Sequence, residues 1–356
     1  VRDRAEQAAC SAALGGDDDG HILHAVAQLE RFRALLGLPL LRGLVVHAHG
    51  VDVVCGRFLC KLARQQEVAR VAVRYLDHLA ALALTCVAST ACADFNADKS
   101  ITVISREEGS GTRGAFVELT GVEQKIDGKK VDMTTDDAQI TNNTAAMLMT
   151  VAGDTQAIGY VSLGSLNETV KAVKIEGVEA TAQNVADGSY KIARPFNIAY
   201  KADGQSDLSK DFVAYIMSAE GQAIINEHGY VGSSDAAAYA GNGAEGKLVV
   251  GGSSSVSPVM EKLIEAYKAV NANADIELQT TDSTTGMTST IDGAYDIGMA
   301  SRELKDSELE AGLTPTVIAQ DGIAVIVNKE NTLTGLTSEQ VLSIYTGETT
   351  DWSELQ

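Results

Sequence analysis

Cysteine and histidine are scarce over most of this 356-residue chain. Beyond residue 98 there is no cysteine and a single histidine, His228. A catalytic thiol is therefore excluded from that part, and a Ser-His pair or a histidine-rich metal site has almost nothing to be built from. The same part lacks a G-x-x-x-x-G-K-[ST] phosphate loop, a G-x-S-x-G nucleophile motif and any carboxylate pair that stands out. We therefore expect a protein that is not an enzyme and that uses no cofactor or metal ion.

Positive charge is also scarce, since 28 Lys and Arg residues face 48 Asp and Glu residues and leave a net charge of −20. A nucleic-acid partner is disfavoured, because phosphate backbones are bound by basic surfaces. The acidic surface does not exclude a small anion, since buried donors act at about 3 Å while surface carboxylates are screened over roughly 8–10 Å of salt. No apolar run is long enough to span a bilayer; the one at residues 79–92 covers about 14 residues.

Composition changes abruptly near residue 98. Residues 1–98 hold all five cysteines, five of the six histidines, nine Arg and one Lys, whereas the rest holds four Arg, fourteen Lys and all seven Met. The first part has ten basic and eleven acidic residues, and the rest has 18 basic and 37 acidic residues. We therefore treat residues 1–98 as a separate, mostly helical leader of unknown role, either foreign to the protein or partly disordered.

Within this leader, apolar spacing predicts helices over residues 21–38 and 59–86, with a short hairpin at 44–54 between them. A metal site there is disfavoured by the spacing of its candidates, which match no common zinc pattern: His47, His49, Cys55 and Cys60. Residues 79–92 fit two hypotheses equally well, a secretion signal that ends before a lipid-modified cysteine and the buried face of a helix. The chain begins with Val, which suggests a fragment or a start assigned upstream of the true one.

Beyond residue 98, strand, glycine-rich turn and helix follow one another repeatedly. Strands are predicted at 101–105, 157–162, 248–250 and 322–328, and helices at 112–119, 207–217, 219–228 and 257–270. Such βα alternation indicates an α/β fold with mixed or parallel sheets flanked by helices. We expect one lobe at 99–204, returning helices at 205–240, a flexible linker at 241–246 within the small-residue stretch 237–246, and a second lobe at 247–356.

Three turns share one design, in which a strand ends, glycine and hydroxyl residues follow, and a helix begins. They are REEGSGT at 106–112, GSSSVS at 252–257 and DSTTG at 282–286. Free N–H groups and partial positive charge at a helix N-terminus suit a tetrahedral oxyanion. One such turn is more often a simple helix cap, but three in one chain favour an anion site.

Arginine is rare here, yet Arg106, Arg113 and Arg302 stand in or beside these turns. A guanidinium holds two oxygens of an anion with parallel hydrogen bonds, which Lys cannot do. We expect Glu108 to pair with Arg106 and orient it. The lysines of residues 125–130 indicate a surface hairpin.

Several segments resemble the phosphate-binding component of bacterial phosphate ABC transporters: ISREEGSGTRGAF, AIGYVSLGSL, RPFNI, GGSSSVSPVMEKL, YDIGMASREL and LTSEQVLSIYTGETTDW. The resemblance covers nearly all of residues 99–356. It implies the two-lobed type II periplasmic-binding-protein fold, inorganic phosphate in the cleft, permease subunits of an ABC transporter as partners, and a place outside the cytoplasmic membrane, free or lipid-anchored. It also implies the phosphate ligands, namely Arg106, Ser110, Gly111, Thr112, Ser254, Ser255, Thr284, Ser301 and Arg302.

Two departures from the family pattern matter. Many relatives have an Asp near the position of Ser301 that takes the proton of bound phosphate, so discrimination against sulfate is in question. The family also runs from GGSSSVSP to TDW and then to ITVISREEGSGT, whereas this chain has those halves reversed. We expect either a circular permutant or, preferably, the end and the start of two tandem domains. A sulfate receptor and a non-binding structural or signalling module with the same fold remain alternatives.

Overall fold

The structure is a computed structural model that describes residues 95–355. The chain divides into two units, Val1–Cys92 and Ala93–Gln356, and the described residues lie in the second. The hypotheses on leader helices, hairpin, metal ligands and secretion signal concern residues outside this described part.

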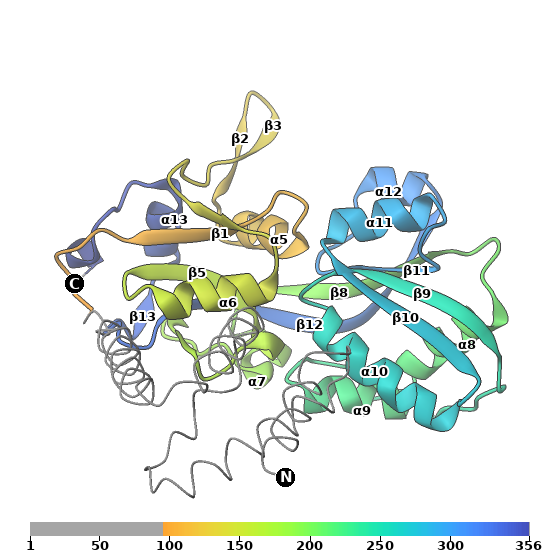
Figure 1. Cartoon of the computed structure of the whole chain (residues 1–356). Helices are drawn as coiled ribbons and strands as arrows, with labels where there is room; N and C mark the ends of the chain where they lie inside the picture. The colour runs from red at the N-terminus through yellow and green to blue at the C-terminus, as the bar shows by residue number, and fades with distance from the viewer. Residues whose placement is uncertain (1–94, 356) are drawn as a thin grey trace, which may run out of the picture. The chain divides into compact units, whose positions relative to one another are not determined.

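Strands and helices alternate along the described chain (Figure 1). The strands are β1 (Thr102–Arg106), β2 (Glu123–Ile126), β3 (Lys129–Asp132), β4 (Gln139–Thr141), β5 (Ala157–Ser162), β6 (Val170–Ala172), β7 (Lys174–Ile175), β8 (Ala193–Lys201), β9 (Gly246–Ser253), β10 (Ala274–Thr281), β11 (Ile297–Ala300), β12 (Leu313–Asn328) and β13 (Gly335–Leu336). The helices are α5 (Gly111–Leu119), α6 (Thr144–Gly153), α7 (Ala182–Ala186), α8 (Asp207–Ile216), α9 (Ala219–Glu227), α10 (Ser257–Val270), α11 (Ser283–Ile291), α12 (Asp306–Glu310) and α13 (Ser338–Thr346), with 3-10 turns at η1 (Leu163–Ser165) and η2 (Trp352–Leu355).

Strand pairing runs in the order β10-β9-β11-β8-β12-β5-β1-β4, with β6 also paired to β12. β9 pairs in parallel with β10 and β11, and β1 pairs in parallel with β4 and β5, whereas β8 and β12 are antiparallel to their neighbours. Helices flank the strands in each lobe (Figure 1). The predicted α/β fold with mixed sheets flanked by helices is thus confirmed.

The long strand β12 belongs to both lobes. Its residues 313–322 pair with β8, and residues 323–328 pair with β5 and β6. One buried cluster joins Val103 and Phe116 to Ile323, Tyr345 and Trp352. We therefore call residues 99–192 with 323–355 the first lobe and residues 193–321 the second lobe.

This division differs from the expected lobes at 99–204 and 247–356. The reason lies in β12, because a strand that continues through both lobes gives no break in sequence where the chain changes lobe. Helices α8 and α9 pack in the core of the second lobe with Phe196, Leu248 and Ile318. This is the lobe to which the sequence analysis expected them to return. Both lobes come from this one chain, so the two sequence halves close on each other.

The helix α10 illustrates how sequence sets the packing. Pro258 stands in its first turn, where the missing N–H costs nothing, and the helix occupies the predicted residues 257–270. Its buried face has helical spacing: Val259, Met260, Leu263, Ile264 and Tyr267. Each such side chain contributes about 1.5–3 kcal/mol when removed from water. None of the helices in residues 95–355 is long and apolar enough to cross a membrane.

Residues 237–245, just before β9, have no helix or strand but are held by hydrogen bonds. The Tyr239 hydroxyl donates to Asp211 Oδ2 at 2.6 Å, and the Asn242 N–H donates to Asp211 Oδ1 at 3.3 Å. Asn271 Nδ2 donates to the Ala244 carbonyl at 2.7 Å. A segment that composition predicts as flexible is therefore tied to α8 and α10.

Candidate functional site

Helix N-termini from both lobes meet at one place. α5 is capped by Ser110 and α6 by Asn143, in the first lobe; in the second lobe α11 is capped by Asp282 and α10 follows the serines of residues 253–255. Each cap side chain of α5, α6 and α11 accepts from a backbone N–H of its own first turn. The other first-turn N–H groups leave partial positive charge at this place.

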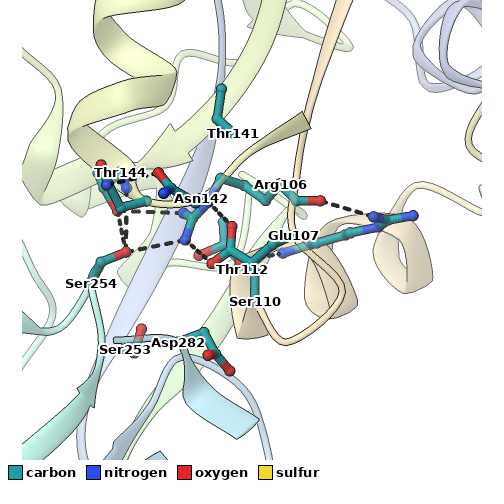
Figure 2. Close-up of polar contacts among 12 residues, drawn as sticks. Arg106, Glu107, Ser110, Thr112, Thr141, Asn142, Thr144, Ser253, Ser254 and Asp282 are labelled. Atoms are coloured by element: carbon teal, nitrogen blue, oxygen red, sulfur yellow. Dashed lines mark hydrogen bonds and ion pairs between the residues drawn. The ribbon is translucent and has the colours of Figure 1, made fainter. Parts of the chain in front are cut away.

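Hydroxyl groups near these helix starts bond to one another across the lobes (Figure 2). Thr112 Oγ1 lies 2.8 Å from Ser255 Oγ. Thr144 Oγ1 lies 3.2 Å from both Ser254 Oγ and Ser255 Oγ. Thr112, Ser254, Ser255 and Thr144 are all at most 6% exposed. Four hydroxyls from two lobes therefore form a buried polar contact.

Ser301, which follows β11, extends this contact within the second lobe. Its hydroxyl accepts from Ser253 Oγ at 2.9 Å and lies 3.4 Å from both Thr112 Oγ1 and Ser283 Oγ. Its backbone N–H donates to Ser283 Oγ at 3.1 Å. We call Thr112, Thr144, Ser253, Ser254, Ser255, Ser283 and Ser301 the hydroxyl cluster.

Arg106 ends β1 beside this cluster and is only 2% exposed. Its Nη2 donates to Ser254 Oγ at 3.1 Å, across the lobes, and its Nη1 to Thr144 Oγ1 at 3.5 Å. Nε and Nη2 also donate to the two carboxylate oxygens of Glu107, at 2.8 and 2.7 Å (Figure 2). The predicted pairing of Arg106 with Glu108 is therefore wrong: Glu107 makes this ion pair, and Glu108 is exposed.

Tyr160 on β5 is hydrogen-bonded to the backbone of Arg106 and helps to hold it in place. Its hydroxyl accepts the Arg106 backbone N–H at 3.1 Å and bonds Ser105 Oγ at 2.9 Å. Its ring stacks on Phe116 of α5 with centroids 4.0 Å apart. Burial raises the pKa of Tyr160, so the hydroxyl stays neutral. Arg113 adds a further support, because its Nη1 donates to the Arg106 carbonyl at 2.9 Å.

Arg302 is held differently from Arg106. Both of its terminal nitrogens donate to Glu308 of α12, at 2.8 and 2.7 Å, and Nη2 lies 3.4 Å from Thr284 Oγ1. Burial pushes the pKa of Glu308 upward, but the bonds from Arg302 and the Lys305 N–H outweigh this and leave the pKa below its ordinary value. The structure thus brings Thr284 and Arg302 together beside Ser301, and the Arg302 guanidinium is hydrogen-bonded to the Glu308 carboxylate.

Two glycines of the RxxGSGT turn permit close approach of the lobes. A Cβ atom on Gly111 would meet Ser283 Oγ and would stand 2.8 Å from Ser301 Oγ. A Cβ atom on Gly109 would collide with the Asp282 carboxylate. The Thr284 N–H also donates to the Gly109 carbonyl at 3.2 Å. Glycine is required here by contact between lobes.

Most residues expected from the sequence lie at this interface, but some of its members were not predicted. Thr144, Ser253, Ser283 and Glu107 belong to the site by their contacts. Ser253 and Ser283 stand in turns that the sequence did indicate. Thr144 follows Asn143 at a helix start, which is a usual cap pattern and gave no sign of a ligand.

Hydrogen-bond donors dominate the chemistry of this interface, where the carboxylates of Glu107 and Glu308 are bound by Arg106 and Arg302. Hydroxyls, guanidinium and helix N-termini donate hydrogen bonds to negatively charged oxygens. His228 is the one histidine of the described residues and is the C-cap of α9. Its Nδ1 lies 2.8 Å from the carbonyl oxygen of Ile224 in the same helix. Within residues 95–355 no group of three or more His, Cys, Asp or Glu side chains could hold a metal ion. Fold and site together define a two-lobed binding protein for a small ligand.

Comparison with known proteins identifies the family. The model of the PBP superfamily domain matches residues 85–220 and 237–356. Phosphate-binding protein PstS 2 of Streptococcus agalactiae is 55% identical over 257 residues, which are 72% of this chain and 88% of the relative. The PstS 2 protein of Streptococcus pneumoniae is 41% identical over 274 residues, 77% of this chain and 94% of the relative. The chain belongs to the PBP superfamily and, within it, to the family of these phosphate-binding proteins.

A solved structure agrees with this family. It is a phosphate ABC transporter phosphate-binding protein from Streptococcus pneumoniae, 42% identical, which covers 72% of this chain and 100% of that chain with a TM-score of 0.59.

Proposed function

We propose that this chain binds inorganic phosphate between its lobes and delivers it to the permease of an ABC transporter. The observation that carries this proposal is the buried hydroxyl cluster that joins both lobes beside Arg106. The names of the relatives, phosphate-binding proteins at 55% and 41% identity, support the same ligand. We propose a receptor role rather than catalysis because the relatives are named phosphate-binding proteins and hydrogen-bond donors from both lobes converge at the site.

Phosphate would be bound by groups from both lobes. We assign Arg106, Ser110, Gly111 and Thr112 from the first lobe, and Ser254, Ser255, Thr284, Ser301 and Arg302 from the second, and we add Thr144. Hydroxyls 2.8 Å apart, such as those of Thr112 and Ser255, bond each other directly. A phosphate oxygen between them takes over both bonds at about 2.7 Å each. Binding therefore requires the lobes to part slightly and then to close on the anion, which is the hinge closure expected of two-lobed receptors.

The hydroxyl of Ser301 can bond either anion. It can accept a hydrogen bond from the P–O–H group that HPO4²⁻ has and sulfate lacks, and it can equally donate to a sulfate oxygen. An Asp in that position would reject sulfate more strongly, because a carboxylate only accepts. From the names of the relatives we expect phosphate to bind more tightly than sulfate, with sulfate as the competitor to test.

Calorimetry and thermal unfolding of the full chain in phosphate-free buffer test the proposal. Phosphate should bind at one site and raise the melting temperature, since a ligand at a thousandfold excess over Kd stabilises by about 4 kcal/mol. Sulfate at the same concentration should give a smaller shift. If a folded sample shows neither binding heat nor a higher melting temperature at millimolar phosphate, the proposal is refuted and the chain is a non-binding module. If sulfate binds more tightly than phosphate, the chain is a sulfate receptor.

A receptor of this kind works outside the cell membrane. We propose that location for this chain, either free or lipid-anchored. The support is again the family of the relatives. Protease treatment of intact cells, with a cytoplasmic protein as control, tests it, because only an extracytoplasmic receptor is digested.

A further inference from the structure

A buried ion pair lies at the hinge, behind the hydroxyl cluster. Arg194 on β8 and Asp321 on β12 face each other in the antiparallel pairing of the two strands that cross between the lobes. Arg194 Nη2 lies 3.0 Å and Nε 3.3 Å from Asp321 Oδ2. The two residues are 3% and 1% exposed. Neither contacts the cluster hydroxyls directly, yet such a pair is costly to bury and calls for a reason.

Asp321 joins this pair to the first lobe. Its second oxygen, Oδ1, accepts from Ser162 Oγ at 2.9 Å and from the Leu163 N–H at 3.1 Å, where β5 ends. Burial raises the pKa of the Asp321 carboxyl to about 6 while the bonds from Arg194 oppose this shift, so the carboxyl is ionised at neutral pH. One carboxylate thus holds the end of β5 with one oxygen and the β8 guanidinium with the other.

Arg194 joins the same pair to the second-lobe side of the cleft. Its Nη1 donates to the Ser301 carbonyl at 3.0 Å. Three positions farther along β8, Asn197 Nδ2 donates to the Arg302 carbonyl at 3.0 Å. Two β8 side chains therefore hold the consecutive carbonyls of Ser301 and Arg302 and restrain the backbone that carries the Ser301 hydroxyl, a member of the hydroxyl cluster.

We propose that Arg194 is a positioning residue for the ligand, which couples alignment of the hinge strands β8 and β12 to the binding geometry of Ser301 and Arg302. The inference rests on the proposed function. When the lobes are closed, Asp321 is anchored by Ser162 and Leu163, and Arg194 reaches both the carboxylate and the Ser301 carbonyl. A hinge rotation that moves Asp321 relative to the end of β5 loosens this anchor and with it the Ser301 segment.

Substitution of Arg194 by Lys tests the coupling in the full chain. A lysine ammonium keeps the charge but lacks the planar fork that spans Asp321 and Ser301. We expect Arg194→Lys to raise the Kd for inorganic phosphate at least tenfold, mainly through a faster dissociation rate in stopped-flow measurements. Asp321→Asn should act in the same direction, because an amide cannot accept two guanidinium N–H groups and an anchor at once.

Asp211→Asn is the matched control. Asp211 is a buried carboxylate of the same lobe, but its partners are the hydroxyls of Tyr239 and Tyr267 and the Asn242 N–H. It should lower the melting temperature while leaving the phosphate Kd within about threefold. An equal loss of affinity in Asp211→Asn would mean that general destabilisation explains the effect and would overturn the coupling.

Ser162→Ala is a second test of the proposal, to be used if Arg194→Lys and Asp321→Asn fail to fold. It removes one anchor of Asp321 and leaves the Arg194–Asp321 pair and the Ser301 carbonyl in place. We expect a threefold to tenfold weaker Kd with near-normal stability. Wild-type Kd in Ser162→Ala and in every folded Arg194 or Asp321 variant overturns the positioning role alone. A wild-type chain that binds no phosphate overturns the proposed function as well, so the two failures are distinguishable.

Discussion

The side-chain oxygens of Thr112 and Ser255 lie 2.8 Å apart, although the two residues belong to different lobes. One is in the first turn of α5 and the other precedes α10. A contact this short between buried hydroxyls means that the lobes are closed on each other at this point. The same two oxygens are the groups that a bound anion would separate and bridge.

Thr112→Val removes one of these hydroxyls with little change in shape. We expect phosphate to bind tenfold to a hundredfold more weakly, about 1.5–3 kcal/mol, the range for a hydrogen bond to a charged group. Calorimetry measures the loss. Thr120→Val at the other end of α5 is the matched control, because the Thr120 hydroxyl bonds only to the Phe116 carbonyl of its own helix. Equal losses in both variants would place the ligand elsewhere.

Gly111→Ala tests whether the lobes must approach as closely as the structure has them. The added methyl group would meet Ser283 Oγ and stand 2.8 Å from Ser301 Oγ, so we expect at least a tenfold loss of phosphate affinity. Gly114→Ala in the same helix has nothing within 4 Å of the added Cβ. It should keep the wild-type Kd and gain about 0.5–1 kcal/mol of stability, since alanine favours a helix. Normal binding by Gly111→Ala would exclude the close interface in the bound state.

Arg106→Lys keeps the charge and loses the fork. A single ammonium cannot bond both Glu107 oxygens and Ser254, so we expect the Kd for phosphate to rise tenfold to a hundredfold. Alanine substitutions of Lys125, Lys129 and Lys130, which lie on the exposed β2–β3 hairpin, should change it less than threefold. The reverse pattern, with Arg106→Lys normal and the lysine variants inactive, would point to a surface basic patch.

Glu308→Gln should change how stability depends on pH. The folded-state pKa of Glu308 lies below its ordinary value of 4.5, so the ionised carboxylate contributes stability above that pH and loses it as the pH falls. We expect the variant to be about 1–3 kcal/mol less stable than wild type at pH 7 and the difference to shrink below pH 4.5. Urea unfolding at pH 7 and at pH 3.5 measures this. A constant difference would show that Glu308 acts without its charge.

The sequence predicted much of the site because its turns are local features. The RxxGSGT segment, the serines before α10 and the DSTTG cap each contain their own signal within a few residues, and the structure places them together. Thr144 could not be found this way, since its role comes from Ser254 and Ser255, more than a hundred residues away. The choice between Glu107 and Glu108 depends on side-chain direction at the end of β1, which adjacent identical residues leave open.

Lobe boundaries were harder to predict than elements. Helices 207–216, 219–227 and 257–270 appear almost where apolar spacing and caps indicate them. The strand predicted at 322–328 is the second part of β12, whose earlier residues 313–321 carry few sequence signals and pair with the other lobe. A change of lobe inside a continuous strand has no turn, glycine run or composition shift to mark it.

The two connections between the lobes, at the start of β8 and the middle of β12, are hydrogen-bonded to each other in register from Arg194–Asp321 to Ala193–Gly322. Two paired strands can bend about one axis but resist twisting, whereas two unpaired connections would allow both motions. The lobes therefore close on a ligand by rotation about a single axis, and few other relative orientations of the lobes are accessible. The entropy lost on closure is correspondingly small, so more of the hydrogen-bond energy remains available as affinity.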